Sequence, residues 1–268
     1  MRSPVIALAA ALAASGAAYA QPAAGGDAPR GPTQFISAGA AMLPDYAGSD
    51  DYRVIPFGAL RLEFGEVVVR TEGPGLAVEL HETGPLTLGV FGRWSGGRDE
   101  VDDAVVALLP EIDNSIIAGG FADLKLAQSV LIPTDRIVLG ARLGADVLGT
   151  FEGAAWTGSV SYAGAVSRKS FFALSASVSG FSDDYADTLF SIDTAGAAAS
   201  GLPVYTAEGG IQDVGITGIY DYGFGDNWSV TTVLGWSRLV GDYADSPIVA
   251  VRGDEDQYFL GLALGRRF

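Results

Sequence analysis

The sequence predicts an all-β fold, an antiparallel transmembrane β-barrel. Three observations support this: side chains alternate between apolar and polar over several long segments, no long apolar stretch follows residue 20, and aromatic residues close the apolar faces. In the clearest segment, one face holds Trp228, Val230, Thr232, Leu234 and Trp236. Strict alternation over about ten residues has the period of a β-strand and the length of a strand that crosses a bilayer at a tilt. Aromatics at both ends of such a face are typical of the two membrane interfaces.

Composition excludes several classes of protein. The 268 residues include 16 Lys and Arg against 32 Asp and Glu, and the resulting net charge of −16 makes nucleic acid an unsuitable partner. Apolar residues make up 49% of the chain, which is too many for an intrinsically disordered protein. With no cysteine and a single histidine, His81, the sequence offers no disulfide, no thiolate ligand and no set of histidine ligands. We therefore expect no enzyme, with no catalytic residue, cofactor site or metal site.

The first 33 residues are expected to lie outside the folded domain. Residues 1–20 have the form of a secretory signal peptide: a positive charge near the start, an apolar run and two small residues before Gln21. The apolar run is shorter than the ~20 residues that a membrane-spanning helix needs. We expect a flexible lead-in, rich in Pro, Gly and Ala, over 21–33 and a barrel over 34–268. This organisation predicts a protein of the Gram-negative outer membrane.

Twelve strands are expected. They lie at about 34–42, 53–64, 66–72, 75–81, 86–94, 115–126, 136–149, 154–166, 170–180, 213–223, 227–237 and 258–268. With the N-terminus in the periplasm, every long connection (43–52, 95–114, 181–212 and 238–257) falls outside the cell, and the periplasmic turns are short, as in bacterial barrels. The strands at 66–72 and 75–81 alternate least clearly, and a barrel of ten strands remains the alternative.

Charged residues lie on the inner face of several predicted strands. Arg61 and Glu63 share that face of one strand, Arg142 and Asp146 share it on another, and Arg93 lies on a third. One interpretation is a set of neutralised, hydrogen-bonded side chains that fill a small barrel. The other is a charged pore that selects solutes. A twelve-stranded barrel is intermediate in width between filled eight-stranded barrels and open porins, so both interpretations stay open.

Two sets of residues on the outer face are expected to meet the membrane or the assembly machinery. All four tryptophans lie at strand ends on that face, where we expect the membrane interfaces: Trp94, Trp156, Trp228 and Trp236. The last strand carries an apolar stripe formed by Tyr258, Leu260, Leu262, Leu264 and Phe268. A terminal Phe after alternating apolar residues resembles the signal by which outer-membrane proteins reach the barrel-assembly machinery, although Arg266 stands where an aromatic is usual.

The acidic loops predict no specific metal site. Clusters such as 99–103 and 242–245 lack the ligand spacing of known calcium loops. Such loops instead meet divalent cations that bridge lipopolysaccharide, or stay solvated. Paired carboxylates for glycoside hydrolysis need a defined cleft that raises one pKa, which exposed loops do not provide. We place His81 near the periplasmic rim, without a catalytic role.

Several strings of residues resemble the MipA/OmpV family of outer-membrane proteins. They are PDYAGSDDYR at 44–53, GRDEVDD at 97–103, AAASGLPVY at 197–205, DVG at 213–215 and SRLVGDYADSPIV at 237–249. The resemblance spans nearly the whole chain after the signal peptide, although the part from 104 to 195 matches only in general pattern.

The resemblance implies a non-catalytic scaffold that links a lytic transglycosylase to a murein synthase. Other members of the family are associated with permeability or adhesion, so a channel for small solutes and an adhesin are the alternatives. The expected partners are outer-membrane lipid and lipopolysaccharide, the barrel-assembly machinery and the two murein enzymes, with no cofactor and no nucleic acid. We expect a monomer.

Overall fold

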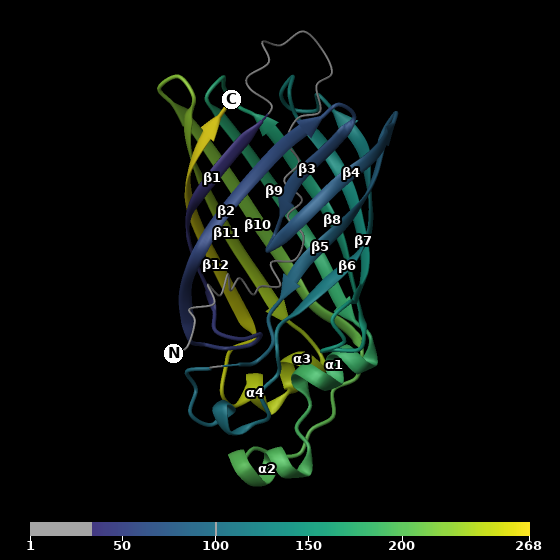
Figure 1. Cartoon of the computed structure of the whole chain (residues 1–268), viewed down its shortest axis with the longest axis vertical. Coiled ribbons are helices and arrows are strands. Elements are labelled where there is room, and N and C mark those ends of the chain that lie inside the picture. Colours follow the sequence, from purple (N-terminus) through teal and green to yellow (C-terminus); the bar gives the residue numbers. More distant parts are fainter. Residues whose placement is uncertain (1–33, 100) are drawn as a thin grey trace, which may run out of the picture.

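Twelve antiparallel strands close into one barrel in the computed structural model, which describes residues 34–99 and 101–268 (Figure 1). Each strand pairs with its neighbours in the sequence, and β1 pairs with β12 to close the sheet. The strands are β1 (Phe35–Pro44), β2 (Tyr52–Phe64), β3 (Val67–Glu72), β4 (Gly75–Thr83), β5 (Leu86–Ser95), β6 (Ser115–Gln128), β7 (Arg136–Asp146), β8 (Ala154–Ala165), β9 (Ser170–Phe181), β10 (Gly210–Phe224), β11 (Trp228–Leu239) and β12 (Asp256–Arg267). The predicted fold class and the count of twelve are confirmed. The alternative of ten strands is wrong.

Alternation along each strand places apolar side chains on the outside of the barrel. On β11, the side chain of Leu234 is 58% exposed, whereas that of its neighbour Val233 is 4% exposed. A bilayer accepts such an apolar band, and a closed barrel leaves no sheet edge that runs the full length of the wall. Among the described residues, no helix has both the length and the apolar character to cross a membrane.

The two ends of the barrel carry very different connections. At one end, the loop end, lie the four long connections 45–51, 96–114, 182–209 and 240–255, at the bottom of Figure 1. At the other, the turn end, the connections have two to seven residues, 65–66, 84–85, 129–135, 166–169 and 225–227. The predicted sorting by length holds for three of the four long connections, whereas 45–51 has the same number of residues as the turn 129–135. The predicted signal peptide (1–20) and lead-in (21–33) lie outside the described residues.

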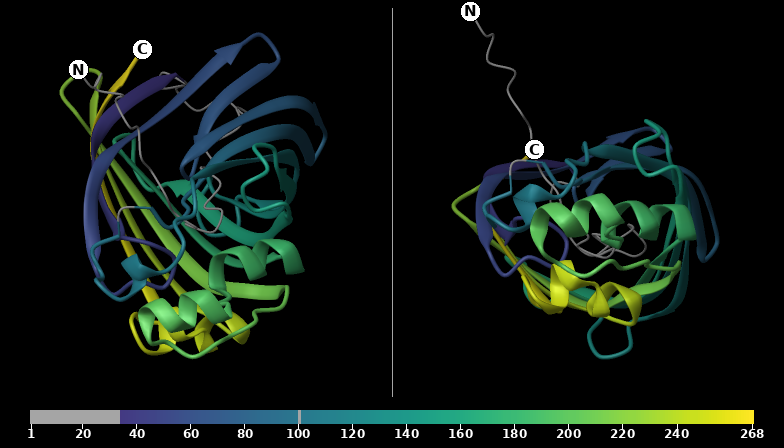
Figure 2. Two further views of the ribbon diagram at one scale, coloured as in Figure 1. Left: turned by 60° about the horizontal axis from the view of Figure 1, so that its bottom comes forward. Right: turned by 90° about the horizontal axis from the view of Figure 1, so that it is seen from below.

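The four long connections together form a cap over the loop end (Figure 2). Four short helices form in two of them, where we had expected only loops: α1 (Asp183–Phe190), α2 (Thr194–Ser200), α3 (Asp242–Asp245) and α4 (Pro247–Ala250). Local signals explain α2: the Asp193 carboxylate accepts a hydrogen bond from the N–H of Gly196 at 2.7 Å, and Gly201 ends the helix with φ of 77°. The connection 96–114 adds a 3₁₀ turn at Val106–Leu108.

The hairpin of β3 and β4 is shorter than its neighbours and leaves part of β2 without a second partner. Only Arg61–Phe64 of β2 pair with β3, so among the described strands residues 52–60 pair with β1 alone. Leu60 N–H points to the β3 side, where it donates to Thr71 Oγ1 at 2.9 Å. Pro56 is four residues before Leu60, so its backbone nitrogen also faces the β3 side. Its missing N–H therefore removes no hydrogen bond to β1.

Candidate functional site in the lumen and cap

The inner face of the barrel has two chemically different walls. The wall from β2 to β7 carries the charged side chains Arg61, Glu63, Arg70, Glu72, Glu79, Arg93, Asp123, Arg136 and Arg142. The wall from β8 to β11 carries buried hydroxyl groups, those of Thr157, Ser159, Ser161, Ser175, Ser179, Thr217, Ser229 and Thr231. The lumen is therefore lined mainly by charges on one side and mainly by hydroxyl groups on the other, where Asp213 and Asp221 of β10 also face inward.

Two arginines are held in the middle of the charged wall by five ion pairs, the longest of which joins Arg70 to Asp123 at 3.3 Å. Arg142 bonds to Glu72 at 2.6 Å and to Asp123 at 2.7 Å, and Arg70 bonds to Glu72 at 2.7 Å and to Glu79 at 2.8 Å. Arg70 and Arg142 are almost fully buried. Buried charges need such partners, because an uncompensated charge away from water is costly. The network ties β3, β4, β6 and β7 together across the wall.

Two further arginines lie nearer the turn end. Arg61 lies 3.4 Å from Glu63 and 3.7 Å from Glu79, so its ion pairs are longer than those of Arg70. In the β2–β3 register, Arg61 stands directly opposite Arg70. Arg136, the first residue of β7, has no ion pair among the residues that the structure describes.

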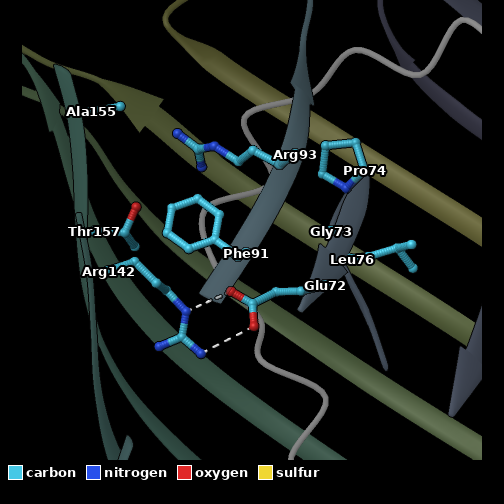
Figure 3. Close-up of a pocket in the computed structure, with 9 residues that line it drawn as sticks. All are labelled: Glu72, Gly73, Pro74, Leu76, Phe91, Arg93, Arg142, Ala155 and Thr157. Atoms are coloured by element: carbon cyan, nitrogen blue, oxygen red, sulfur yellow. Dashed lines mark hydrogen bonds and ion pairs between the residues drawn. The ribbon is translucent and has the colours of Figure 1, made fainter. Parts of the chain in front are cut away.

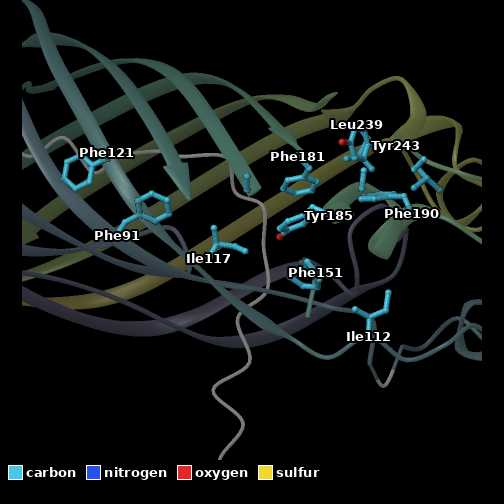
Figure 4. Packing of buried hydrophobic residues seen from close by; sticks show 14 of the residues in the cluster. Phe91, Ile112, Ile117, Phe121, Phe151, Phe181, Tyr185, Phe190, Leu239 and Tyr243 are labelled. Carbon is cyan, nitrogen blue, oxygen red and sulfur yellow. The ribbon is translucent and has the colours of Figure 1, made fainter. Parts of the chain in front are cut away.

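Aromatic rings join the charged wall to the cap. The guanidinium carbons of Arg70 and Arg142 each lie 5.3 Å from the centre of the Phe121 ring, a cation–π distance. Phe121 belongs to the same buried cluster as Phe91 of β5 and Tyr185 of the cap. The cluster therefore extends from Phe121, beside the arginines, to Tyr185 in the cap (Figure 4).

A small pocket of about 20 Å³, partly open to solvent, lies at the loop-end side of the network (Figure 3). Its lining combines the charged groups of Glu72, Arg93 and Arg142 with the apolar surfaces of Pro74 and Phe91. Arg93 has no ion pair among the described residues and points into this space (Figure 3).

Aromatic side chains of the cap form the loop-end part of this hydrophobic cluster. The rings of Phe181 and Tyr185 stack at 3.8 Å, and those of Phe190 and Tyr243 meet edge to face at 5.0 Å. All four side chains are buried. Burial of aromatic surface is the main favourable term in such a cluster. The cap is thus a packed structure that covers the loop end.

Hydrogen bonds link all four connections of the cap. Asp102 N–H donates to Asp45 Oδ2 at 2.9 Å, Arg98 Nη1 donates to the Leu189 carbonyl at 2.9 Å, Ser246 Oγ donates to the Phe190 carbonyl at 2.7 Å, and Ser49 bridges Gly253. Burial lowers the pKa of Arg98 to about 10, so its guanidinium stays charged at neutral pH. Burial raises the pKa of Tyr243 to about 12, so its phenol stays neutral.

A family model described as MltA-interacting protein MipA matches residues 36–268. The chain belongs to this family. The resemblance that the loop strings indicated is thereby confirmed, and the barrel is of the outer-membrane type. No curated protein matches the chain.

Solved structures are similar in fold alone. An outer-membrane channel from Pseudomonas putida F1 is 14% identical, with 92% of this chain and 100% of that chain covered and a TM-score of 0.40. CymD, a monoaromatic hydrocarbon channel, is 11% identical, with 89% of each chain covered and a TM-score of 0.37.

The structure places the predicted tryptophans of this MipA-family member at strand ends with outward parity. Trp94, Trp156 and Trp236 lie near the loop end, and Trp228 begins β11 at the turn end. Trp236 Nε1 donates to Asp256 at 2.9 Å. Contact of these rings with the membrane interfaces stays a prediction.

The predicted lumen charges are on the inner face, but their partners differ from a simple pairing along each strand. Arg61 contacts Glu63, as neutralisation predicts. Arg142 contacts Glu72 and Asp123 instead of Asp146. The Asp146 carboxylate accepts hydrogen bonds from the hydroxyl of Ser115 and from N–H groups of 148–152, which fixes the β7–β8 connection.

Five residues of the charged wall were missed in the sequence: Arg70, Glu72, Glu79, Asp123 and Arg136. The first three lie on the two strands that alternate least clearly. A signal was present, since Arg70 and Glu72 are two apart, as are Arg61 and Glu63. Opposite charges with same-face spacing on two consecutive strands indicate a charged wall.

The remaining predicted residues lie on β4, on β12 or directly after β12. Phe268 follows β12, is exposed, and its N–H donates to the Gln34 carbonyl at 3.1 Å. Tyr258, Leu260, Leu262 and Leu264 point outward from β12. His81 is exposed on β4 beside a bulge. Within the part of the chain that the structure describes, no group of His, Asp or Glu could hold a metal ion.

Proposed function

We propose that the protein is a non-catalytic scaffold of the outer membrane that positions murein-remodelling enzymes, a lytic transglycosylase together with a murein synthase. The observation that carries the proposal is the cap, because its buried aromatic core covers the loop end of the barrel. A barrel covered in this way is suited to hold a position in the membrane rather than to pass solutes freely. The family description, MltA-interacting protein, supports a murein enzyme as the partner.

The turn end is the face that a periplasmic enzyme would meet. Its longest connection, 129–135, is held by Asp135, whose carboxylate accepts hydrogen bonds from the N–H groups of Val130, Leu131 and Ile132 and from the Tyr162 hydroxyl. Burial opposes ionisation here, but these hydrogen bonds hold the pKa of Asp135 at about 2. The fixed turn presents Leu131 with 78% of its surface exposed. A rigid apolar tip loses little entropy on binding.

Retention of a purified lytic transglycosylase by the tagged, detergent-solubilised barrel tests the scaffold proposal. We expect the wild type to retain the enzyme and Leu131→Asp to lose most of it. Leu148→Asp is the matched control, since Leu148 is an exposed leucine at the loop end. Equal retention by Leu131→Asp would exclude this turn as the contact. No retention by the wild type would exclude the scaffold role with this partner.

A channel for small solutes is the second candidate, favoured by the two-walled lumen. Charges on one side and hydroxyl groups on the other are what a solute pathway offers. Planar-bilayer recording separates the two functions. We expect little or no conductance while the cap is closed. A stable unitary conductance in the wild type that shifts its ion preference in Arg142→Gln, with no enzyme retained, would replace the scaffold with the channel.

A further inference from the structure

We propose that the pocket at the tip of the β3–β4 hairpin binds the carboxylate of a free fatty acid that enters sideways from the membrane. Arg93 holds the carboxylate, and the acyl chain lies in the incomplete part of the wall between β2 and β5. This site can be occupied whether or not the barrel retains an enzyme or conducts, so the inference goes beyond the proposed function.

Arg93 is the charged residue of this pocket that lacks a partner. It lies on β5, and its side chain points into the pocket (Figure 3). Among the residues that the structure describes, no carboxylate forms an ion pair with it. Glu72, the acid in the same lining, is already occupied: its Oε1 accepts from Arg142 at 2.6 Å and its Oε2 from Arg70 at 2.7 Å. An arginine left without a carboxylate at membrane depth points to a ligand.

The wall of the barrel is incomplete beside this pocket. The hairpin occupies the space between β2 and β5 only as far as its tip at 73–74 (Figure 1). From there toward the loop end, residues 52–60 of β2 pair with β1 alone, and Trp94 and Ser95 of β5 pair with β6 alone. No described strand closes this space, which we term the wall gap.

The lining of the pocket includes residues from both faces of the wall. Thr157 of β8 is 4% exposed on the inner face, whereas Leu76 of β4 is 46% exposed on the outer face. Pro74 and Phe91 add apolar surface to the same lining. A ligand in this pocket can therefore contact the charged lumen with one end and the bilayer with the other.

The size of the pocket determines which part of a ligand it holds. Its volume of about 20 Å³ is room for roughly one water molecule. A carboxylate group is of similar size, whereas an acyl chain or the phosphate diester of a phospholipid is larger. The two oxygens of a carboxylate also match the two parallel N–H donors of a guanidinium group. The head of a fatty acid thus fits the pocket, and its chain must lie outside, in the wall gap.

The free edge of β2 favours an amphiphile over a plain hydrocarbon. Leu60 N–H faces away from β1, and Val54 and Gly58 have the same parity, so their backbone groups face the wall gap. Backbone polar groups at membrane depth need water or a polar partner. A carboxylate with its hydration water provides such a partner, and an alkane does not.

Photolabelling of the full-length protein in phosphatidylcholine nanodiscs tests the proposal. The probe is palmitic acid with a diazirine in its chain, ionised at alkaline pH, and the control probe is the corresponding uncharged alcohol. We expect the acid to label peptides that contain the hairpin tip or residues 52–60. The alcohol should label the outer face without this preference, and unlabelled palmitate should compete with the acid probe.

Substitution of Arg93 tests the head-group contact. Arg93→Gln should raise the acid concentration needed for half-maximal labelling about tenfold or more, since a charge-assisted hydrogen-bond pair is lost. The variant should fold, because Arg93 has no ion pair to lose in the described structure. Arg93→Lys keeps the charge without the paired donors and should be intermediate. Arg266→Gln removes an arginine from the outer face at the turn end, where Arg266 stacks on Trp228, and should label like the wild type.

Substitution of Leu76 tests entry through the wall. Leu76→Trp narrows the outer side of the pocket and should reduce labelling by the acid severalfold. Leu88→Trp is the matched control, because Leu88 is an exposed leucine on the outer face of β5 near the turn end, and it should not change the labelling.

Equal labelling of the hairpin tip and 52–60 by the acid and the alcohol would overturn the proposal, as would unchanged labelling in Arg93→Gln. Displacement of the acid by phosphatidylglycerol would assign the site to a phospholipid phosphate and exclude the fatty acid. Full labelling in Leu76→Trp, with loss in Arg93→Gln, would overturn the sideways route.

Discussion

The cap covers the loop end of the barrel and the charged wall lines its lumen, and different forces hold these two regions. Stacked and edge-to-face aromatic rings hold the cap, whose core includes Tyr185 and Tyr243. Ion pairs of 2.6–2.8 Å hold the wall, and Glu72 is the carboxylate that pairs with both Arg70 and Arg142. Apolar packing is non-directional and survives small shifts, whereas a buried ion pair fails when one partner is removed. The cap should therefore tolerate single substitutions better than the wall, which depends on every partner of its ion pairs.

Glu72→Leu should give the largest effect. It removes the carboxylate shared by Arg70 and Arg142 and leaves two buried cations short of a partner. We expect a loss of roughly 3–5 kcal/mol in the free energy of unfolding, measured by urea titration in lipid vesicles. Glu66→Leu, on the exposed turn before β3, is the control and should be nearly neutral. A decrease of less than 1 kcal/mol in the free energy of unfolding of Glu72→Leu would mean that the network does not stabilise the barrel.

Leu234→Arg tests the outer face against the lumen. Leu234 faces outward in the middle of β11, where an arginine should cost roughly 2–4 kcal/mol in vesicle refolding. Val233 is packed against Ile219 in the lumen, so Val233→Arg is costly too and serves poorly as a control. Ser237→Arg, half-buried on the inner face of the same strand, should cost less. The reverse order would place the strand register one residue out.

Ile248→Ala sharpens the comparison from the side of the cap. Ile248 is buried against Tyr46 and Val106 from two other connections. We expect a loss of about 2 kcal/mol, confined to hydrogen exchange in the cap, with global unfolding of the barrel unchanged. Val251→Ala, exposed in the same connection, is the control. If the barrel itself were destabilised equally, the cap and wall would form a single cooperative unit.

Lowering the pH should loosen the contact between Asp103 and Arg252 in the cap before it disturbs the aromatic core. Burial raises the pKa of Asp103, but hydrogen bonds from Arg252 and from the N–H of Val106 hold it below its ordinary value of 3.8. Because the pKa of Asp103 is lowered in the folded state, its ionised carboxylate stabilises the folded cap above pH 3.8. This contribution is lost as the pH falls through the lowered pKa. Proteolysis of the cap should rise severalfold between pH 5 and about pH 3. The rise should be absent in Arg252→Gln, which lacks the contact at every pH.

The sequence was sufficient for the barrel, because alternation and loop length are properties of single strands and single connections. It was insufficient for the charged wall. Arg142 is 70 positions from Glu72 and 19 positions from Asp123 in the sequence, so no local pattern specifies these contacts. The helices of the cap are intermediate in how far the sequence predicts them. Asp193, Gly201 and Pro247 are terminal signals that capping rules identify, but alternation analysis does not use them.

The short β3–β4 hairpin leaves an edge of β2 with which a strand of another chain could pair. Residues 52–60 of β2 present a row of backbone groups that no described strand covers, and such a row is a template on which a foreign strand can grow. A foreign strand docked there needs an N–H donor at every second residue. Pro56 interrupts that series at its centre, on the side that faces away from β1. Pro56 thus removes one of the N–H donors that a foreign strand would need in order to pair with this edge.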